Sequence, residues 1–223
     1  MRPTPALRPL DVRRLGRVPY ADALELQAEL VKQRRAGEVP DTLLLLEHPH
    51  VITLGSGSHE EHVLVTAEER AARGIDLFET GRGGDVTYHG PGQLVGYPIF
   101  DLKPDRQDLH RYLRDIEEAL IGVLADFGIE GTRKEGLTGV WAGDRKLAAI
   151  GVRVSSGWIT SHGFALNVGT DLSFFGTIVP CGIRDHAVGS LSGELGREVA
   201  LEEAEASAVR WFEQTFGMQP RST

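Results

Sequence analysis

The sequence contains one cysteine, two methionines and few aromatic residues, which make up 7% of its 223 residues. A single cysteine excludes a framework of internal disulfide bonds. No apolar run approaches the ~20 residues that a membrane-spanning helix needs. The first twenty residues are basic but lack the apolar stretch of a secretory signal. These absences favour a protein of the cytoplasm that does not enter a membrane.

The chain also has fewer basic than acidic residues. The net charge is -8, because 24 Lys and Arg residues face 32 Asp and Glu residues, and this argues against a general affinity for nucleic acid. Hydrophobic residues at 41% and charged residues at 25% are typical of a globular protein with a sizeable core. Without an internal repeat or a linker, one domain over residues 1–223 is the simplest organisation, with residues 1–20 as a peripheral N-terminal arm.

Apolar residues at three- and four-residue spacing predict four helices. The spacing of Thr66 and Glu69 is that of a capping box, which begins the second and shortest of them. A glycine directly follows each helix, where it ends the helical pattern. The four predicted helices cover residues 22–36, 66–73, 108–127 and 201–216.

Short runs rich in apolar residues predict strands between these helices. They cover residues 42–46, 51–54, 94–100, 140–142, 146–154 and 158–168. Gly143 and Asp144 separate the fourth and fifth runs, which predicts a two-residue hairpin turn. Because helices and strands alternate irregularly, the pattern favours an α/β (α+β) protein in which helices flank a mixed sheet.

The stretch "GRGGDVTYHGPGQLVGYPI", residues 81–99, contains six glycines. A phosphate-binding loop of the Walker type needs a Gly-Lys-Ser/Thr ending that opens a helix, and this stretch leads into a strand instead. The glycine order of a dinucleotide-binding loop is absent as well. Asp85 and His89 are too few ligands for a metal site. The residues alone leave two interpretations open, a glycine-rich connection and a loop that contacts a ligand.

Cys181 is a candidate nucleophile, since a lone thiol can be reactive when a nearby cation stabilises its thiolate. The candidate cations are Lys146, His89, His162 and Arg184, and sequence distance does not choose among them. Lys146 opens a predicted strand, where desolvation would lower a lysine pKa and make the amine a usable base. His162 fits either a core histidine bonded to a backbone carbonyl or a residue of the site.

Four segments of the chain together resemble one family. They are "HPHVITLG" (48–55), "RGGDVTYHGPGQLVGYPI" (82–99), "LTGVWAGDRKLAAIGV" (137–152) and "SHGFALNVGTDLSFFGTIVPCGI" (161–183). In this order they resemble the octanoyl-acyl-carrier-protein:protein N-octanoyltransferases of lipoate biosynthesis, over residues 42–193. The resemblance implies the fold of biotin and lipoate protein ligases, a mixed sheet flanked by helices with a second small sheet.

The resemblance also implies roles for individual residues. Cys181 would be the nucleophile that holds the acyl group as a thioester, and Lys146 would lower the pKa of its thiol and act as general acid and base. No residue is implied as a metal ligand. The residues implied for substrate binding are Arg82, Gly83, Gly84, Asp85, Val86, Thr87, Tyr88, His89, Ala149, Ile150, Gly151, Gly163, Phe164 and Ala165, with His162 in support.

The activity implied by the resemblance is transfer of an octanoyl or lipoyl group from acyl carrier protein to a specific lysine of a lipoyl domain. The acceptors would be the lipoyl domains of 2-oxoacid dehydrogenase complexes and the glycine cleavage H protein. The enzyme would be a cytoplasmic monomer that needs no cofactor beyond the phosphopantetheine of the carrier. Candidate docking residues for these acidic partners are Arg111, Arg114, Arg133, Lys134, Arg145 and Arg153.

Three other functions compete with this one. A lipoate or biotin protein ligase would activate a free acid with ATP and would need no thiol, so Cys181 favours the transferase. An amidotransferase that moves octanoyl between lipoyl proteins is also thiol-based, and the segments around residues 82–99 and 181 fit it less well. A binding module for acyl carrier protein would have no acyl-enzyme at all.

Overall fold

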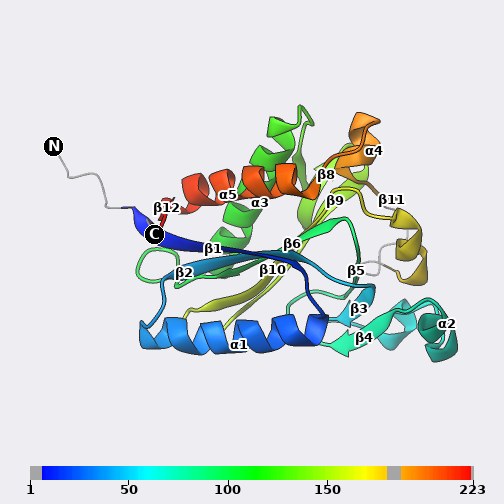
Figure 1. Ribbon diagram of the computed structural model, residues 1–223, viewed down its shortest axis with the longest axis horizontal. Coiled ribbons are helices and arrows are strands. Elements are labelled where there is room, and N and C mark those ends of the chain that lie inside the picture. Colours follow the sequence, from blue (N-terminus) through cyan, green and yellow to red (C-terminus); the bar gives the residue numbers. More distant parts are fainter. Residues whose placement is uncertain (1–6, 180–186, 222–223) are drawn as a thin grey trace.

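The computed structural model describes residues 7–179 and 187–221. In these ranges nine strands form a large sheet, in the order β12-β1-β2-β6-β10-β9-β8-β7 with β11 paired to β9 (Figure 1). The strands are β1 (Arg8–Arg17), β2 (Asp41–Glu47), β6 (Gln93–Ile99), β7 (Thr132–Lys134), β8 (Leu137–Ala142), β9 (Arg145–Val154), β10 (Thr160–Asn167), β11 (Ala187–Val188) and β12 (Met218–Pro220).

A small sheet and the helices complete the fold. The small sheet has the order β4-β3-β5, made of β3 (Val51–Leu54), β4 (Asp76–Glu79) and β5 (Val86–His89). The α-helices are α1 (Tyr20–Ala36), α2 (Ala67–Ala72), α3 (Leu109–Asp126), α4 (Leu191–Leu195) and α5 (Leu201–Phe216), and two 3₁₀ turns are η1 (Glu60–His62) and η2 (Leu172–Thr177).

The large sheet is mixed and lies between two layers of helices. β1 runs parallel to β2 and β12, whereas β2, β6, β10, β9 and β8 pair antiparallel. Helix α1 covers one face, and α3 and α5 cover the other (Figure 1). This arrangement, with its second small sheet, confirms the predicted fold class.

Strand β2 shows why the sheet is buried on both faces. Its side chains alternate between the two faces of the sheet. Leu43 and Leu45 belong to the core beneath α3 and α5, while Leu44 and Leu46 belong to the core beneath α1. All four are fully buried. A continuous apolar run is therefore the pattern expected for a strand covered on both sides.

The predicted helices are confirmed to within two residues at each end. The Thr66 side chain accepts a hydrogen bond from the Glu69 N–H, and the Glu69 carboxylate accepts one from the Thr66 N–H, so the capping box begins α2 as predicted. Asp108 caps α3 through the N–H groups of His110 and Arg111. The predicted hairpin is also confirmed, with Ala142 paired to Arg145 across the turn.

The sequence did not predict the short elements β4, β7, β11 and α4, and further differences lie at the chain ends and in the glycine-rich stretch. Residues 8–17, which the sequence suggested as part of a peripheral arm, form β1 between β12 and β2. The pairing joins Arg8 to Met218 and Leu10 to Asp41, so it depends on partners 30 or more positions away. Within the glycine-rich stretch, β5 pairs with β3 rather than forming a loop throughout.

Candidate active site

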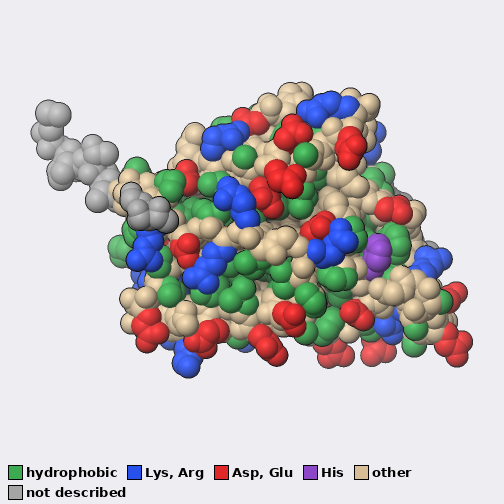
Figure 2. Space-filling model, in the orientation of Figure 1, with side chains coloured by type: hydrophobic (Ala, Val, Ile, Leu, Met, Phe, Trp, Pro, Cys, Tyr) green, Lys and Arg blue, Asp and Glu red, His purple; other side chains and the backbone are tan. Residues whose placement is uncertain are grey.

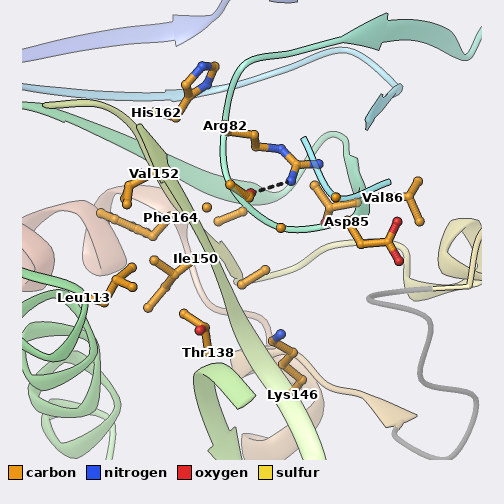
Figure 3. Close-up of a pocket in the computed structure, with 18 of the residues that line it drawn as sticks. Arg82, Asp85, Val86, Leu113, Thr138, Lys146, Ile150, Val152, His162 and Phe164 are labelled. Atoms are coloured by element: carbon orange, nitrogen blue, oxygen red, sulfur yellow. Dashed lines mark hydrogen bonds between the residues drawn. The ribbon is translucent and has the colours of Figure 1, made fainter. Parts of the chain in front are cut away.

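A cavity of about 470 Å³ lies between β9, β10, the loop before β5 and the start of α3. Its size is in the range of small-molecule binding sites. Figure 3 shows Lys146 and Thr138 at one end of it and His162 and Arg82 at the other. The sequence-predicted residues that line it are Arg82, Gly83, Gly84, Asp85, Val86, Thr87, His89, Lys146, Ala149, Ile150, Gly151, His162, Gly163, Phe164 and Ala165.

The loop that contains Arg82 is held in place by its own arginine. The buried guanidinium donates to the backbone oxygen of Thr53 at 2.7 Å and to its hydroxyl at 2.8 Å, which ties the loop to β3. A further bond reaches the carbonyl of Gly83 at 3.1 Å (Figure 3). The loop is therefore a rigid wall of the cavity, because charge-assisted hydrogen bonds inside a protein are strong.

Glycine allows the loop and β9 to approach each other closely. The Gly83 N–H donates to the Val152 carbonyl at 2.9 Å. A Cβ atom at Gly151 would lie 2.9 Å from the carbonyl oxygen of Gly83, closer than real Cβ atoms come. Gly84 has a φ of +86°, which residues with a side chain rarely adopt. The stretch is thus both a tight connection and a wall of the cavity.

Tyr88 does not line the cavity, although the resemblance placed it in the substrate site. It lies between Thr87 and His89 on β5, and neighbouring side chains of a strand point to opposite faces. Its ring packs in the core of the small sheet, 5.3 Å from the Phe174 ring. Its hydroxyl lies 2.7 Å from Nδ1 of His50. Tyr88 thus supports the sheet behind the cavity wall.

Lys146 reaches the cavity because of an irregularity in β9. The pairing of β8 with β9 runs from Val140 with Ala148 to Trp141 with Lys146, so β9 has one extra residue, Leu147. Such a bulge re-aims the neighbouring side chain. Leu147 and Ala148 both point into the core, and the half-buried Lys146 lies with its Nζ 5.4 Å from the centre of the Trp141 ring.

Cys181 lies outside the described residues, but the chain on both sides of it is placed beside the cavity. The N–H of Val179 donates to the carbonyl of His62 at 2.8 Å, and His62 Nδ1 lies 2.6 Å from the Asp85 carboxylate in the cavity wall. On the other side, Val188 lines the cavity and pairs with Lys146.

A hydrogen-bonded chain connects the cavity to the start of β9. His89 Nδ1–H donates to Gln93 Oε1 at 2.7 Å, the Gln93 amide donates to Asn167 at 2.9 Å, and the Asn167 amide donates to the Gly189 carbonyl at 2.9 Å. The other two bonds of the network assign the Gln93 oxygen as the acceptor, so His89 is protonated on Nδ1 and its Nε2 is an acceptor. The Gly189 N–H in turn donates to the backbone carbonyl of Lys146 at 3.0 Å.

Three buried histidines remain neutral at pH 7. Burial lowers the pKa of His89 to about 3, with further contributions from nearby groups, and lowers that of His48 to about 4. For His162, burial and the charges of Arg82 and Arg153 lower the pKa to about 4. His162 has a φ of +55°, and its buried Nδ1 has no hydrogen-bond partner among the described residues. These features favour a site role over that of a carbonyl-bonded core histidine.

Acid is expected to destabilise the fold through these histidines. Because their folded pKa values lie below the usual 6.5, their contribution to stability is present above pH 6.5 and is lost as the pH falls toward 4. His48→Gln keeps a donor for Val18 and an acceptor for Tyr97 but does not titrate. Between pH 6.5 and 5 the free energy of unfolding, measured with urea, should fall by about 1.5 kcal/mol less in this variant than in the unaltered chain. An equal fall in the two proteins would contradict the inference that His48 is neutral in the folded chain.

The candidate docking residues are largely engaged within the chain. Arg114 and Arg133 both pair with Glu117, Lys134 pairs with Asp144, and Arg145 pairs with Glu194. None of the six lines the cavity. Figure 2 shows basic and acidic side chains interspersed on one face, with acidic ones along the edge formed by α1. The docking prediction therefore stays a prediction.

Among residues 7–179 and 187–221, no three His, Cys, Asp or Glu side chains lie close enough to share a metal ion, and no helix has the length and apolar character to cross a bilayer.

Several cavity residues were not singled out from the sequence. Thr138 and Trp141 lie in the quoted segment 137–152, so the signal for them was present. Leu113 belongs to the apolar stripe of α3, which suggested only a core position. Leu109, 43% exposed, lies at the start of that stripe and also lines the cavity. The stripe therefore extends beyond the core to the cavity.

Sequence comparison gives close relatives over nearly the whole chain. Residues 19–213 match the lipoyl protein ligase A/B catalytic domain. The octanoyltransferase of Rubrobacter xylanophilus is 57% identical over 210 residues, which cover 93% of this chain and 94% of that protein. The octanoyltransferase of Solibacter usitatus is 52% identical over 208 residues, 93% of both. The match extends beyond residues 42–193 on both sides.

Solved structures with the same fold have much lower identity. Lipoate-protein ligase A bound with ATP superimposes with a TM-score of 0.74 at 17% identity, over 97% of this chain and 88% of that one. A structure of a bipartite lipoate protein ligase and its lipoyl domain from Thermoplasma acidophilum superimposes with a TM-score of 0.73 at 18% identity, over 98% of this chain and 87% of that one. These likenesses confirm the predicted ligase-like fold, and the close sequence relatives are decisive for the family: the chain belongs to the octanoyltransferases, within the lipoyl protein ligase A/B catalytic domain family.

Proposed function

We propose that this chain transfers an octanoyl or lipoyl group from acyl carrier protein to a lysine of a lipoyl domain, through a thioester on Cys181. The proposal rests on the position of Lys146 at one end of a largely apolar cavity, close to the chain on either side of Cys181. Val188, which follows the Cys181 segment, pairs with Lys146. Val179, which precedes that segment, is bound to His62 beside the cavity wall. A thiol, an amine and an acyl slot are what such a transfer needs.

The first half of the reaction exchanges one thioester for another. The Cys181 thiolate attacks the carbonyl carbon of the octanoyl group, a new carbon–sulfur bond forms, and the bond to the phosphopantetheine sulfur breaks. Lys146, which has taken the Cys181 proton, returns a proton to the leaving thiolate. Because the bond made and the bond broken are of one kind, this step is close to isoenergetic and needs no ATP.

The second half makes an amide. The neutral ε-amine of the acceptor lysine attacks the acyl-enzyme, a carbon–nitrogen bond forms, and the Cys181 thiolate leaves. Lys146 accepts the proton that the attacking amine loses. The net reaction converts a thioester and an amine into an amide and a thiol, which is downhill. The residues proposed to act are those of one chain, with no metal or further cofactor.

The acyl chain is proposed to lie along β9 and β10, away from Lys146. Ala149, Gly151 and Gly163 present little side-chain volume to the cavity there. Phe164 and Val152 add apolar surface (Figure 3). Burial of the methylenes at ~0.8 kcal/mol each would contribute on the order of 5 kcal/mol before ordering costs. Small residues beside the slot and large apolar ones around it suit a straight chain.

The proposed acceptors are the lipoyl domains of 2-oxoacid dehydrogenase complexes and the glycine cleavage H protein. One structural relative is described together with its lipoyl domain, which supports a lipoyl domain as the protein partner here. A reducing compartment such as the cytoplasm keeps a nucleophilic thiol in its reduced form. The chain is proposed to act there as a monomer.

Intact-protein mass spectrometry tests the proposal. Incubation with octanoyl-acyl carrier protein should add the mass of one octanoyl group to the chain, and hydroxylamine should remove it, because hydroxylamine cleaves thioesters. Addition of a lipoyl domain should move the group to that domain, where it should resist hydroxylamine as an amide. A chain that gains no mass but retains the carrier on a sizing column would be a binding module.

The same assay distinguishes the proposed transferase from an ATP-dependent ligase. In that case free octanoate with ATP and magnesium should acylate the lipoyl domain, whereas octanoyl-acyl carrier protein should not. Transfer from the carrier without ATP would exclude it. Transfer from an octanoylated lipoyl protein but not from the carrier would instead identify an amidotransferase.

A further inference from the structure

Glu117 on α3 is a buried carboxylate that the proposed reaction does not use. Its side chain is 1% exposed, and burial of a charge is costly unless partners compensate for it. One oxygen, Oε2, accepts hydrogen bonds from Arg114 at 2.6 Å and Arg133 at 3.1 Å. The other, Oε1, accepts the backbone N–H of Gly139 at 3.1 Å. Glu117 therefore links α3 to a single peptide of β8.

Gly139 lies directly against the side chain of Lys146. Its φ is +133°, a conformation that side-chain-bearing residues rarely adopt. A Cβ atom there would lie 2.5 Å from Lys146 Cε, 3.2 Å from Lys146 Nζ and 2.6 Å from the carbonyl oxygen of Ala148. The last atom belongs to the backbone and cannot move aside easily. The space taken by the lysine chain exists because residue 139 has no side chain.

The Lys146 side chain also lies close to Trp141. Trp141 pairs directly with Lys146 across the bulge, and the Nζ lies 5.4 Å from its ring centre. A cation over an indole face is attracted to it. Gly139 and Trp141, two residues apart, lie on the same face of β8. The Lys146 chain thus lies over two successive positions of one strand.

We propose that Gly139, held by the buried carboxylate of Glu117, is a positioning residue that sets where the Lys146 amine lies in the cavity. This inference rests on the proposed role of Lys146 as general acid and base. Loss of the Gly139 bond to Glu117, or a methyl group at Gly139, would displace the amine from the reacting atoms. A displacement of about 1 Å can lower a rate ~100-fold.

Gly139→Ala is expected to lower octanoyl transfer to the lipoyl domain ~100-fold. Gly143→Ala is the matched control, because Gly143 also has a positive φ, +54°, lies in the turn between β8 and β9, and has nothing within 4 Å of an added Cβ. The control also places a side chain at a positive φ, although a less restricted one than the +133° of Gly139, and it does not touch Lys146. Equal losses in the two variants would overturn the proposal.

A double-mutant cycle separates positioning from general loss of structure. In a Lys146→Ala background, Gly139→Ala should cause little further loss, because the group that it displaces is already gone. If the alanine lowers transfer by the same factor in both backgrounds, Gly139 acts through the fold and not through Lys146, and the proposal fails.

Glu117→Gln provides a second variant in case Gly139→Ala folds poorly. A glutamine amide offers one oxygen, so its NH₂ group must face either the Gly139 N–H or an arginine, and both are donors. Transfer should fall ~10-fold, in proportion to the loss of a hydrogen bond to a charged group. Glu118→Gln is the control, since Glu118 shares Arg133 but is exposed and lies on the outer face of α3. Equal activity in the two variants would count against Glu117.

Amine labelling keeps this inference distinct from the proposed function. The rate at which acetic anhydride modifies Lys146, followed by peptide mass spectrometry over a range of pH, is measured without an acyl donor and so requires no reaction at Cys181. Gly139→Ala and Glu117→Gln should change this profile, and their controls should not. A changed profile in a chain that forms no acyl-enzyme would refute the proposed function alone. An unchanged profile in a chain that does form one would refute the positioning role alone.

Discussion

Replacement of Cys181 by serine is expected to lower octanoyl transfer by ~10⁴-fold or more, in line with the loss of a nucleophile in other covalent enzymes. A thiol forms its reactive thiolate near neutral pH, while a serine hydroxyl stays protonated unless a strong base activates it. Single-turnover transfer from octanoyl-acyl carrier protein, followed by mass spectrometry of the lipoyl domain, measures the loss. The midpoint of thermal unfolding should not change.

The composition makes this test sharp. Cys181 is the only cysteine, so any thiol-specific adduct reports on it alone. Cys181→Ala controls for slow acylation of a serine oxygen: the serine variant should gain a hydroxylamine-resistant octanoyl group slowly or not at all, and the alanine variant should gain none. Turnover retained by either variant would end the assignment of Cys181 as the nucleophile.

Local signals predicted the longer helices and the central strands of the large sheet. The capping box at Thr66, the stripe of α3 and the two-residue turn after Ala142 all act over a few residues, and the structure contains each of them. Strand β1 escaped prediction because its sequence, RPLDVRRLGR, has only three apolar residues besides its proline. It forms by parallel pairing with β2 and with β12 near the other end of the chain, and no local pattern reports such pairing.

In the candidate site too, some residues could be predicted from the sequence and others could not. Motif similarity predicted the loop, β9 and β10 positions that the structure brings around one cavity, but it also included Tyr88, which strand alternation turns toward the small sheet. Glu117 left no readable signal, and Gly139 lies in the quoted segment 137–152 but had no role assigned to it. Their contact joins a helix to a strand 22 residues later, and the closeness of Gly139 to Lys146 depends on a bulge that spacing alone does not reveal.

Lys146→Ala is expected to lower octanoyl transfer by ~10²- to 10⁴-fold, the range typical of a general acid and base. If Lys146 acts on Cys181 as proposed, loss of its ammonium group should also raise the pKa of the Cys181 thiol, because a positive charge favours the thiolate. Iodoacetamide alkylation of the single cysteine should then reach half its maximal rate at higher pH. A small primary amine added to the variant should restore part of the activity by occupying the vacated space.

Lys134→Ala is the control that isolates the position of the charge. The Lys134 Nζ lies 4.5 Å from the same Trp141 ring, but its ammonium pairs with Asp144 and does not line the cavity. Both variants remove one positive charge from the same indole, so a general electrostatic effect would change the two alkylation profiles alike. If only Lys146→Ala shifts the profile, the thiolate is stabilised by an amine in the cavity. If neither variant shifts it, Lys146 does not act on Cys181.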